Sequence, residues 1–453
     1  MERFRELCEL SALALSDDAK SERAEGPVER LLAWLGYRPR PDEPSFDRAN
    51  AVALLRAAAG FTRLFQLLAA EAPGLVCFGA EVDPFAGAPA PEGWQQHWSV
   101  SGTGLTLRAA FESCVGEGIE LLSQFARETD LFESAPLAAG LAALSPESGE
   151  AFADLLAAVP PGASVEWCGA FRLADRRPVR LPADLCFRRP LRQRAIAPPH
   201  PVGIGCGAGP SFEAAALHAL LELVERDAAC LWWQGGRRGR MIGVDTEAGR
   251  AVADLLPALR RGQRTRRSWL LDITSDLGIP AVASISSTAD GFGFACGVAA
   301  RPSLAEAATS ALREMCQIEL AHQVVEIKRS ESGDARLNAI DLAHLRRRRE
   351  IDTGSCTLLH PLPPAPTHRD LAPAPPGQML QHLVEHLAAQ GIETFALDLT
   401  RPDLAISAAR VVCPLLAKET AANAMPGSYG SRLRRAIEET GGGNICTGGL
   451  PLM

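Results

Sequence analysis

Residues 212–233 read FEAAALHALLELVERDAACLWW, a stretch too apolar for a surface helix. Ser211 stands directly before it as an N-cap, and alanine and leucine, both strong helix formers, make up most of it. Glu222 and Glu225 lie three residues apart, so their carboxylates project from the same side of the helix. The stretch therefore predicts a helix that is buried on most faces and carries two neighbouring carboxylates.

Two adjacent carboxylates in an apolar setting need a compensating group. They repel each other and lose hydration, at a cost of several kcal/mol unless a proton, a base or a metal offsets it. Arg226 follows Glu225 directly, but it projects about 100° away around the helix, so we expect that it does not neutralise both carboxylates. The pattern predicts a further positive group beside Glu222 and Glu225.

A second segment follows the same plan. Residues 106–126 are expected to form a mostly apolar helix that begins at an N-cap, Thr106, and carries Glu117 and Glu120. The two glutamates are again three residues apart. The segment therefore predicts another pair of carboxylates on one helix face.

A third segment, residues 303–322, begins with the capping box Ser303-Leu-Ala-Glu306 and places Glu314 and Gln317 on one face. If the three helices converge, they form an oxygen-only site, which suits Mg²⁺ rather than zinc; its ligands would be Glu117, Glu222, Glu225 and Glu314. Mg²⁺ usually works beside phosphates. The alternative for any one glutamate is an exposed position on an amphipathic helix.

Glycine-rich turns precede two of these helices. Ser101-Gly-Thr-Gly104 leads into the first, and Gly203-Ile-Gly-Cys-Gly-Ala-Gly209 leads into the helix that begins at Phe212. Free backbone N–H groups and the positive end of a helix are able to hold phosphate oxygens. The chain has no GxxxxGK[ST] sequence, so these turns are not Walker A loops.

The chain resembles the YcaO proteins from about residue 95 to about residue 415. The matching stretches, in the family's order, are Ser113-x-x-x-Glu117, GAGPSFEAAALHALLELVERDAA, ACGVAARPSLAEAATSALRE, and GIETFALDLTRPDL followed by RVVCP. The resemblance implies a YcaO-like fold. It also implies an enzyme that uses ATP and Mg²⁺ to phosphorylate a backbone amide oxygen of a ribosomally made peptide.

The resemblance also implies roles for individual residues. Magnesium would be held by Glu117, Glu222, Glu225 and Glu314. The nucleotide would be contacted by Ser113, Gly205, Gly207, Gly209, Arg226 and Gln317. It implies a homodimer that acts on a precursor peptide with a leader, together with an E1-like leader-binding protein.

The leading hypothesis is cyclisation of Cys, Ser or Thr side chains into azolines. The second is peptide thioamidation, with an external sulfur donor and a TfuA-type partner, and the third is a nucleotide-binding scaffold without chemistry of its own. The chain ends Gly448-Gly-Leu-Pro-Leu-Met453, with one proline where many azoline-forming members have PxPxP, which favours the second. Thr103 stands where many members have lysine, which keeps the third open.

Alternating helices and short strands after residue 93 predict an α+β fold of layered sheets with long helices packed on them. Residues 1–92 are expected to be a mainly helical accessory region, with 48–70 as its clearest helix, and 93–453 the catalytic domain. Within that domain, 360–377 is proline-rich and expected to be an extended surface segment. The glycine-rich end, 440–453, is expected to be a flexible tail able to reach inward.

The composition is that of an ordinary globular protein, with 47% hydrophobic and 22% charged residues and a net charge of −8. This charge gives no reason to expect nucleic-acid binding. Two stretches are locally basic, 260–267 and 346–349, and each is either a solvated surface or a docking patch for an acidic leader peptide or partner.

Twelve cysteines without a CxxC pair are expected to be buried thiols in a reducing compartment. No export signal and no membrane span is visible, so a cytoplasmic location is expected.

Overall fold

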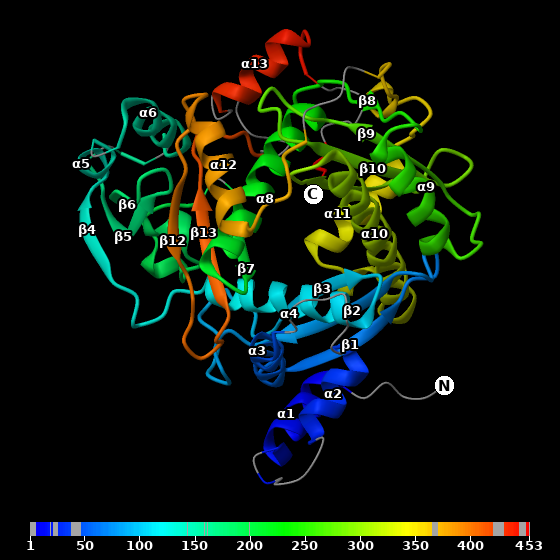
Figure 1. The fold of residues 1–453 in the computed structure, drawn as a ribbon. Coiled ribbons are helices and arrows are strands. Elements are labelled where there is room, and N and C mark those ends of the chain that lie inside the picture. Colours follow the sequence, from blue (N-terminus) through cyan, green and yellow to red (C-terminus); the bar gives the residue numbers. More distant parts are fainter. Residues whose placement is uncertain are drawn as a thin grey trace.

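The computed structural model describes most of the chain. The described residues are 6–18, 20, 26–37, 47–142, 144–157, 159–160, 162–198, 200–364, 370–419, 430–443 and 450–452. Three antiparallel sheets surround three long helices, α4 (Leu107–Ser123), α8 (Phe212–Trp233) and α10 (Leu304–Ser332), as Figure 1 shows. The predicted α+β fold of sheets with long helices packed on them is confirmed.

The first sheet has the order β1 (Arg63–Leu68), β2 (Val76–Val82), β3 (Trp98–Gly104), and α4 packs on β2 and β3. The helices α1 (Leu7–Asp18), α2 (Pro27–Leu35) and α3 (Arg48–Ala59) precede it. One apolar core runs from α1 through these strands into α4. The sheet and this core cross residue 92, the predicted end of an accessory region.

The second sheet has the order β4, β5, β12, β13, β7, with β6 paired to β5. These strands are β4 (Phe132–Pro136), β5 (Ser164–Arg172), β6 (Pro178–Pro182), β7 (Cys206–Gly209), β12 (Phe395–Asp398) and β13 (Ser407–Val412). The short helices α5 (Leu137–Leu141), α6 (Pro146–Leu155) and α7 (Ala183–Cys186) lie at its β4 end. The other end, β13 and β7, supports α8, and α12 (Pro376–Ala388) packs on α8.

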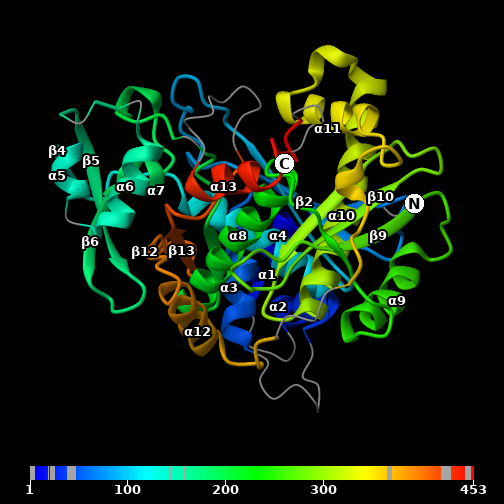
Figure 2. The same ribbon diagram turned by 90° about the horizontal axis from the view of Figure 1, so that it is seen from above.

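The third sheet has the order β11 (Ala295–Ala300), β10 (Ala281–Ser287), β9 (Arg267–Asp272), β8 (Arg240–Met241). Helix α10 packs on β10 and β11, and α9 (Glu247–Arg260) and α11 (Ala339–Glu350) pack on α10. Helix α13 (Ser431–Glu439) packs on α8. Figure 2 shows the second and third sheets on opposite sides of α4 and α8.

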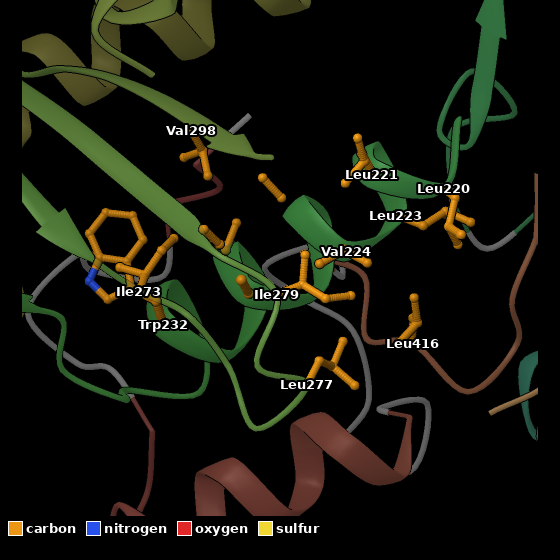
Figure 3. Close-up of a cluster of buried hydrophobic side chains, with 14 of the residues drawn as sticks. Leu220, Leu221, Leu223, Val224, Trp232, Ile273, Leu277, Ile279, Val298 and Leu416 are labelled. Atoms are coloured by element: carbon orange, nitrogen blue, oxygen red, sulfur yellow. The ribbon is translucent and has the colours of Figure 1, made fainter. Parts of the chain in front are cut away.

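The three long helices also contact one another's sheets in a closed ring. Helix α4 touches β7, α8 touches β11, and α10 touches β3. In each case the helix meets the strand that leads into the next helix of the ring. The apolar core around α8, including Leu223, Val224 and Val298, fills one part of this ring (Figure 3).

A glycine allows each of these helices to lie close to its strand. A Cβ added at Gly102 would lie 2.0 Å from the backbone N of Cys114, one at Gly207 2.4 Å from the Ala215 oxygen, and one at Gly297 2.2 Å from the Met315 N. Such distances are far below van der Waals contact, so a larger residue would push the helix away. Close packing therefore explains the glycines of β3, β7 and β11.

The sequence predicted one helix over residues 48–70, but the structure shows a helix followed by a strand. Helix α3 ends at Ala59, and residues 63–68 form β1. Leucine and glutamine in this stretch favour a helix, but pairing of Arg63–Leu68 with Val76–Glu81 along β2 outweighs that preference. The prediction failed because helix propensity within 48–70 takes no account of the strand that follows it.

The end of the chain is packed at its last described residues. Leu450 and Leu452 are buried in the core around α8. Trp233 Nε1 donates a hydrogen bond of 2.8 Å to the Leu450 oxygen, and Arg347 Nη1 donates one of 3.0 Å to the Pro451 oxygen. The glycine-rich part, 444–449, lies outside the described residues, and so does 365–369 of the proline-rich segment. Residues 450–452 therefore lie inward against the core around α8, and the flexibility predicted for 440–453 stays a prediction.

Candidate functional site

The acidic residues predicted to form the site occupy equivalent positions on the three helices. Thr106, Ser211 and Ser303 are the N-caps of α4, α8 and α10, and each accepts a backbone N–H through its side chain. The carboxylates of Glu117, Glu222 and Glu314 each follow their N-cap by eleven residues. Fourteen residues after the caps come Glu120, Glu225 and Gln317. Equal spacing places these side chains at the same height on all three helices.

The four predicted ligands share one electrostatic neighbourhood. Burial, and then the charge of Glu222, raises the pKa of Glu117 to about 7. Burial also raises the pKa of Glu225 to about 8, with a contribution from Glu314, and that of Glu314 to about 7, with a contribution from Glu222. Carboxylates on α4, α8 and α10 therefore lie close enough to repel one another.

Glu117 is accessible and desolvated at once. Its side chain reaches solvent, yet the surrounding protein is dense enough to raise its pKa. A ligand can therefore reach the Glu117 carboxylate, although the surrounding protein disfavours its charged form.

Arg226 contacts both carboxylates of α8, contrary to the prediction from helix geometry. Its Nη2 lies 3.3 Å from Glu222 Oε1 and 3.6 Å from Glu225 Oε1. The prediction considered only the direction in which Arg226 leaves the helix. Its long side chain bends back along the helix and reaches both carboxylates. Its buried Nε has no hydrogen-bond partner among the described residues. Arg226 therefore lies within the cluster and offsets part of its negative charge.

Gly205 holds Glu222 in place. Its backbone N–H donates a hydrogen bond of 2.9 Å to Glu222 Oε2, so this N–H serves a carboxylate in the structure. Gly205 has a φ of +85°, and a Cβ there would lie 2.5 Å from the Val411 oxygen. Gly207 and Gly209 are part of β7 and lie opposite residues of β13. Their contact with a nucleotide stays a prediction.

Gln317 and Ser113 border the acidic cluster. Gln317 joins α10 to β3, since its Oε1 accepts a hydrogen bond of 3.1 Å from Thr103 Oγ1 and its Nε2 donates one of 3.0 Å to Ser101 Oγ. Ser113 lies one helical turn before Glu117 and is exposed. Residues 101–104, predicted to be a glycine-rich turn, form the end of β3 because they pair with β2, and they are tied to α10, while Ser113 stays available to a ligand.

The carboxylates of Glu117, Glu222, Glu225 and Glu314 do not surround a single point in the structure. Within the described ranges, no group of three or more His, Cys, Asp or Glu side chains is placed to hold a metal ion. Arg226 and the Gly205 N–H engage two of the side chains. Mg²⁺ commonly uses only one or two carboxylates, with waters and phosphate oxygens completing its octahedron. The donor set, carboxylate oxygens from three helices, fits Mg²⁺ beside a polyphosphate.

Two further residues belong to this cluster. Glu120 makes no hydrogen bond or ion pair with a described residue, and burial, with the charges of Glu117 and Glu222, holds its pKa well above the usual range. The sequence pattern contained Glu120, but the set of ligands implied by the resemblance omitted it. Arg301 lowers the pKa values of Glu225 and Glu314 through its charge. Its signal in the sequence is its place two residues before the N-cap Ser303.

The family sequence model described as "YcaO cyclodehydratase, ATP- and Mg²⁺-binding" matches residues 101–417, which is most of the chain. The chain belongs to the YcaO family. The resemblance seen in the sequence is confirmed, and so are the cofactors ATP and Mg²⁺. No curated protein matches the sequence significantly.

Solved structures share the YcaO fold. A heterocyclase in complex with substrate and cofactor has a TM-score of 0.64 and 22% identity, over 80% of this chain and 50% of that chain. YcaO from Methanopyrus kandleri, bound with AMPPCP and Mg²⁺, has a TM-score of 0.57 and 20% identity, over 88% and 93%. The E. coli microcin synthetase McbBCD complex gives 0.58 and 15%, over 83% and 95%. This YcaO chain spans about half the length of the heterocyclase.

Other sequence predictions have clear outcomes. The eleven described cysteines are free thiols, and all except Cys296 are buried. In the part of the chain that the structure describes, no helix is both long and apolar enough to cross a bilayer.

The acidic cluster predicts how stability depends on pH. The pKa of Glu225 in the folded protein, about 8, lies above its ordinary value of 4.5, so folding favours the protonated form. The stability this gives is complete below about pH 4.5 and is lost as pH rises through about 8. Without nucleotide, we expect urea unfolding to show lower stability at about pH 9 than at about pH 5, and a smaller difference in Glu225→Gln. Glu213 on the same helix, with a side chain 42% exposed, provides the control, Glu213→Gln, which should match the wild type. An unchanged pH dependence in Glu225→Gln would contradict the raised pKa.

Proposed function

We propose that this YcaO protein uses ATP and Mg²⁺ to phosphorylate backbone amide oxygens of a ribosomally made peptide, and that it cyclises Cys, Ser or Thr residues to azolines. The supporting observation is the cluster of carboxylates gathered from α4, α8 and α10, with Arg226 and Arg301 beside it. Phosphoryl transfer depends on positioning and charge neutralisation more than on a covalent protein group. These side chains provide both.

Bound Mg²⁺ would neutralise phosphate charge and align the transferred phosphoryl group. In the proposal, Glu117, Glu222, Glu225 and Glu314 would hold it, and we add Glu120 to this set because its pKa responds to the charges of Glu117 and Glu222. The Gly205 N–H fixes the orientation of Glu222. Nucleotide contacts are proposed for Ser113, Arg226, Gln317, Gly207 and Gly209, with Gly205 acting through Glu222.

The chemistry of the substrate explains why amide activation is needed. An amide oxygen is a poor leaving group. The side-chain thiol or hydroxyl of the substrate adds to the preceding carbonyl carbon and loses its proton, and the former carbonyl oxygen takes the γ-phosphoryl group from ATP. Cleavage of the C–O bond then releases phosphate, and loss of the amide proton leaves the C=N bond of the azoline. The net change is loss of one water from the peptide and conversion of ATP to ADP and phosphate.

Thioamidation is the second candidate. It uses the same activation, but an external sulfur donor replaces the oxygen, with a TfuA-type partner. Amide activation at the same acidic cluster serves this reaction too, so the cluster supports it alongside cyclisation. A scaffold without chemistry is the third candidate, and it would consume no ATP.

The proposal includes partners. The substrate is a precursor peptide with a leader, presented by an E1-like leader-binding protein or, for thioamidation, handled with a TfuA-type protein. Support comes from relatives of similar fold: one heterocyclase was solved with its substrate, and the microcin synthetase is a complex of several proteins. We also propose a homodimer and a cytoplasmic location.

Mass spectrometry of the precursor peptide after incubation with this protein, ATP, Mg²⁺ and the partner set tests the proposal. Cyclisation is expected to remove the mass of one water for each azoline. Thioamidation instead adds, at each site, the mass difference between sulfur and oxygen. A peptide of unchanged mass together with unconsumed ATP would contradict both and leave the scaffold. Reactions without ATP serve as the control.

A further inference from the structure

A hollow lies on the side of α10 away from the acidic cluster. Its volume is about 410 Å³, within the range of small-ligand pockets. Charged and polar side chains line it, among them Glu71, Arg266, Glu319, His322, Glu326 and Arg348. Five residues separate Glu314 from Glu319, which places them about 140° apart around the helix. The hollow is therefore separate from the acidic cluster.

Two of the three carboxylates in its wall, Glu319 and Glu326, already have cationic partners, and the third, Glu71, accepts a hydrogen bond from the Thr265 hydroxyl. Glu319 accepts hydrogen bonds from Arg260, at 2.6 and 2.8 Å, and from Arg266 Nε, at 2.8 Å. Glu326 accepts one of 3.0 Å from Arg348 Nη1 and forms an ion pair of 3.2 Å with Arg329. A cation entering the hollow would have to compete with these arginines. The carboxylates therefore give it little to bind.

The arginines keep unused donors. The guanidinium of Arg348 makes one side-chain hydrogen bond to a described residue, the one to Glu326, and a guanidinium has five N–H groups. Arg348 is about one-third exposed, so these groups can meet a ligand. Planar guanidinium groups suit carboxylates because they can donate two parallel hydrogen bonds.

His322 supplies an independent sign of a missing ligand. It is only 4% exposed, it lines the hollow, and its Nδ1 has no hydrogen-bond partner in the described part of the chain. Burial, and then His344 and Arg348, lowers its pKa to about 3, so the ring is neutral. A buried, unpaired ring nitrogen carries an energetic penalty. In the tautomer with a proton on Nδ1, a ligand oxygen would satisfy it.

The two basic stretches of the sequence meet at this hollow. Arg266 belongs to the basic stretch 260–267 and directly precedes β9. Arg348 belongs to the basic stretch 346–349 on α11. We propose that the hollow binds a carboxylate, carried either by an acidic peptide segment or by a free small dicarboxylate. Arg348 and His322 would donate to the carboxylate, and Arg266 would add positive charge beside it. The site goes beyond amide activation and needs no ATP.

Isothermal titration calorimetry on the full chain, without ATP, tests this site. The probes are N-acetylated, C-amidated tetraglutamate, glutarate and inorganic phosphate. We expect tetraglutamate or glutarate to bind more tightly than phosphate. Tighter binding of the peptide points to an acidic segment, and tighter binding of glutarate points to a free dicarboxylate. Arg348→Gln should weaken the preferred probe about ten- to a hundred-fold, as expected for loss of a charge-assisted hydrogen bond.

Arg346→Gln is the matched control. Arg346 lies on the same helix, is 62% exposed and pairs with Glu350, so its replacement removes the same charge outside the hollow. Arg348→Gln should fold, because Glu326 keeps Arg329 as a partner. Ser330→Trp, which fills the rim, provides a second variant and should also abolish binding. Absence of binding by both carboxylate probes, or equal weakening in Arg346→Gln and Arg348→Gln, would overturn the proposal.

Discussion

Glu222→Ala is expected to lower ATP turnover by about a hundred- to a thousand-fold, the size typical for loss of one preorganised electrostatic group. Glu222 lies between the carboxylates of α4 and α10, and the Gly205 N–H and Arg226 orient it. Removing it takes away a proposed magnesium ligand. Phosphate release in the presence of peptide and partners measures the effect.

The same variant should fold. Loss of one charge relieves repulsion within the cluster, while the Gly205 N–H loses its partner at a cost of about 1–3 kcal/mol, and the two effects oppose each other. Glu213→Ala is the matched control, because Glu213 is an exposed glutamate on the same helix, 3.7 Å from Arg176. Wild-type turnover in Glu222→Ala would remove the basis for the metal assignment.

Truncation after residue 449 is expected to reduce the free energy of unfolding by about 3–6 kcal/mol, from the exposure of Leu450 and Leu452. It also removes the Leu450 oxygen, which accepts a hydrogen bond from the indole N–H of Trp233. Arg347 donates a hydrogen bond to Pro451. The charges of Arg347 and Glu314 both shift the pKa of Cys296, so the end of the chain lies close to the acidic cluster. We therefore expect ATP turnover to fall as well. Denaturant unfolding and phosphate release measure the two effects.

A point variant separates packing from chain length. Leu450→Ala should destabilise the protein by about 2–5 kcal/mol, as for other buried leucines, whereas Leu131→Ala should have almost no effect because Leu131 is 88% exposed. Equal stability of Leu450→Ala and the wild type would mean that the end of the chain does not pack as described.

Local sequence predicted the parts of the site that local physics determines. Ser211 and Ser303 act as N-caps, as expected, and the three-residue spacing places Glu222 and Glu225 on one face of α8. Helix propensity, capping and periodicity all act within a few turns, so a single sequence contains them. The resemblance to a known family then implied that the carboxylates of the three helices belong to one site.

Long-range contacts determine the rest. Strand β1 forms because β2 pairs with it, although its leucines and glutamine also suit a helix. Arg301 joins the cluster because β11 brings it beside α8 and α10, and Gly207 is needed where β7 approaches the backbone of α8. Such facts depend on which segments meet, and local patterns do not contain them.

The equal count from N-cap to carboxylate on α4, α8 and α10 limits which changes in length the gene can accept. One residue inserted between Ser211 and Glu222 would turn the carboxylate by about 100° and shift it by about 1.5 Å along the axis. The other two carboxylates would then face an empty third position. Insertions before β3, in the loop after Val82, change no such count. Length variation among natural relatives should therefore gather outside the three cap-to-carboxylate intervals.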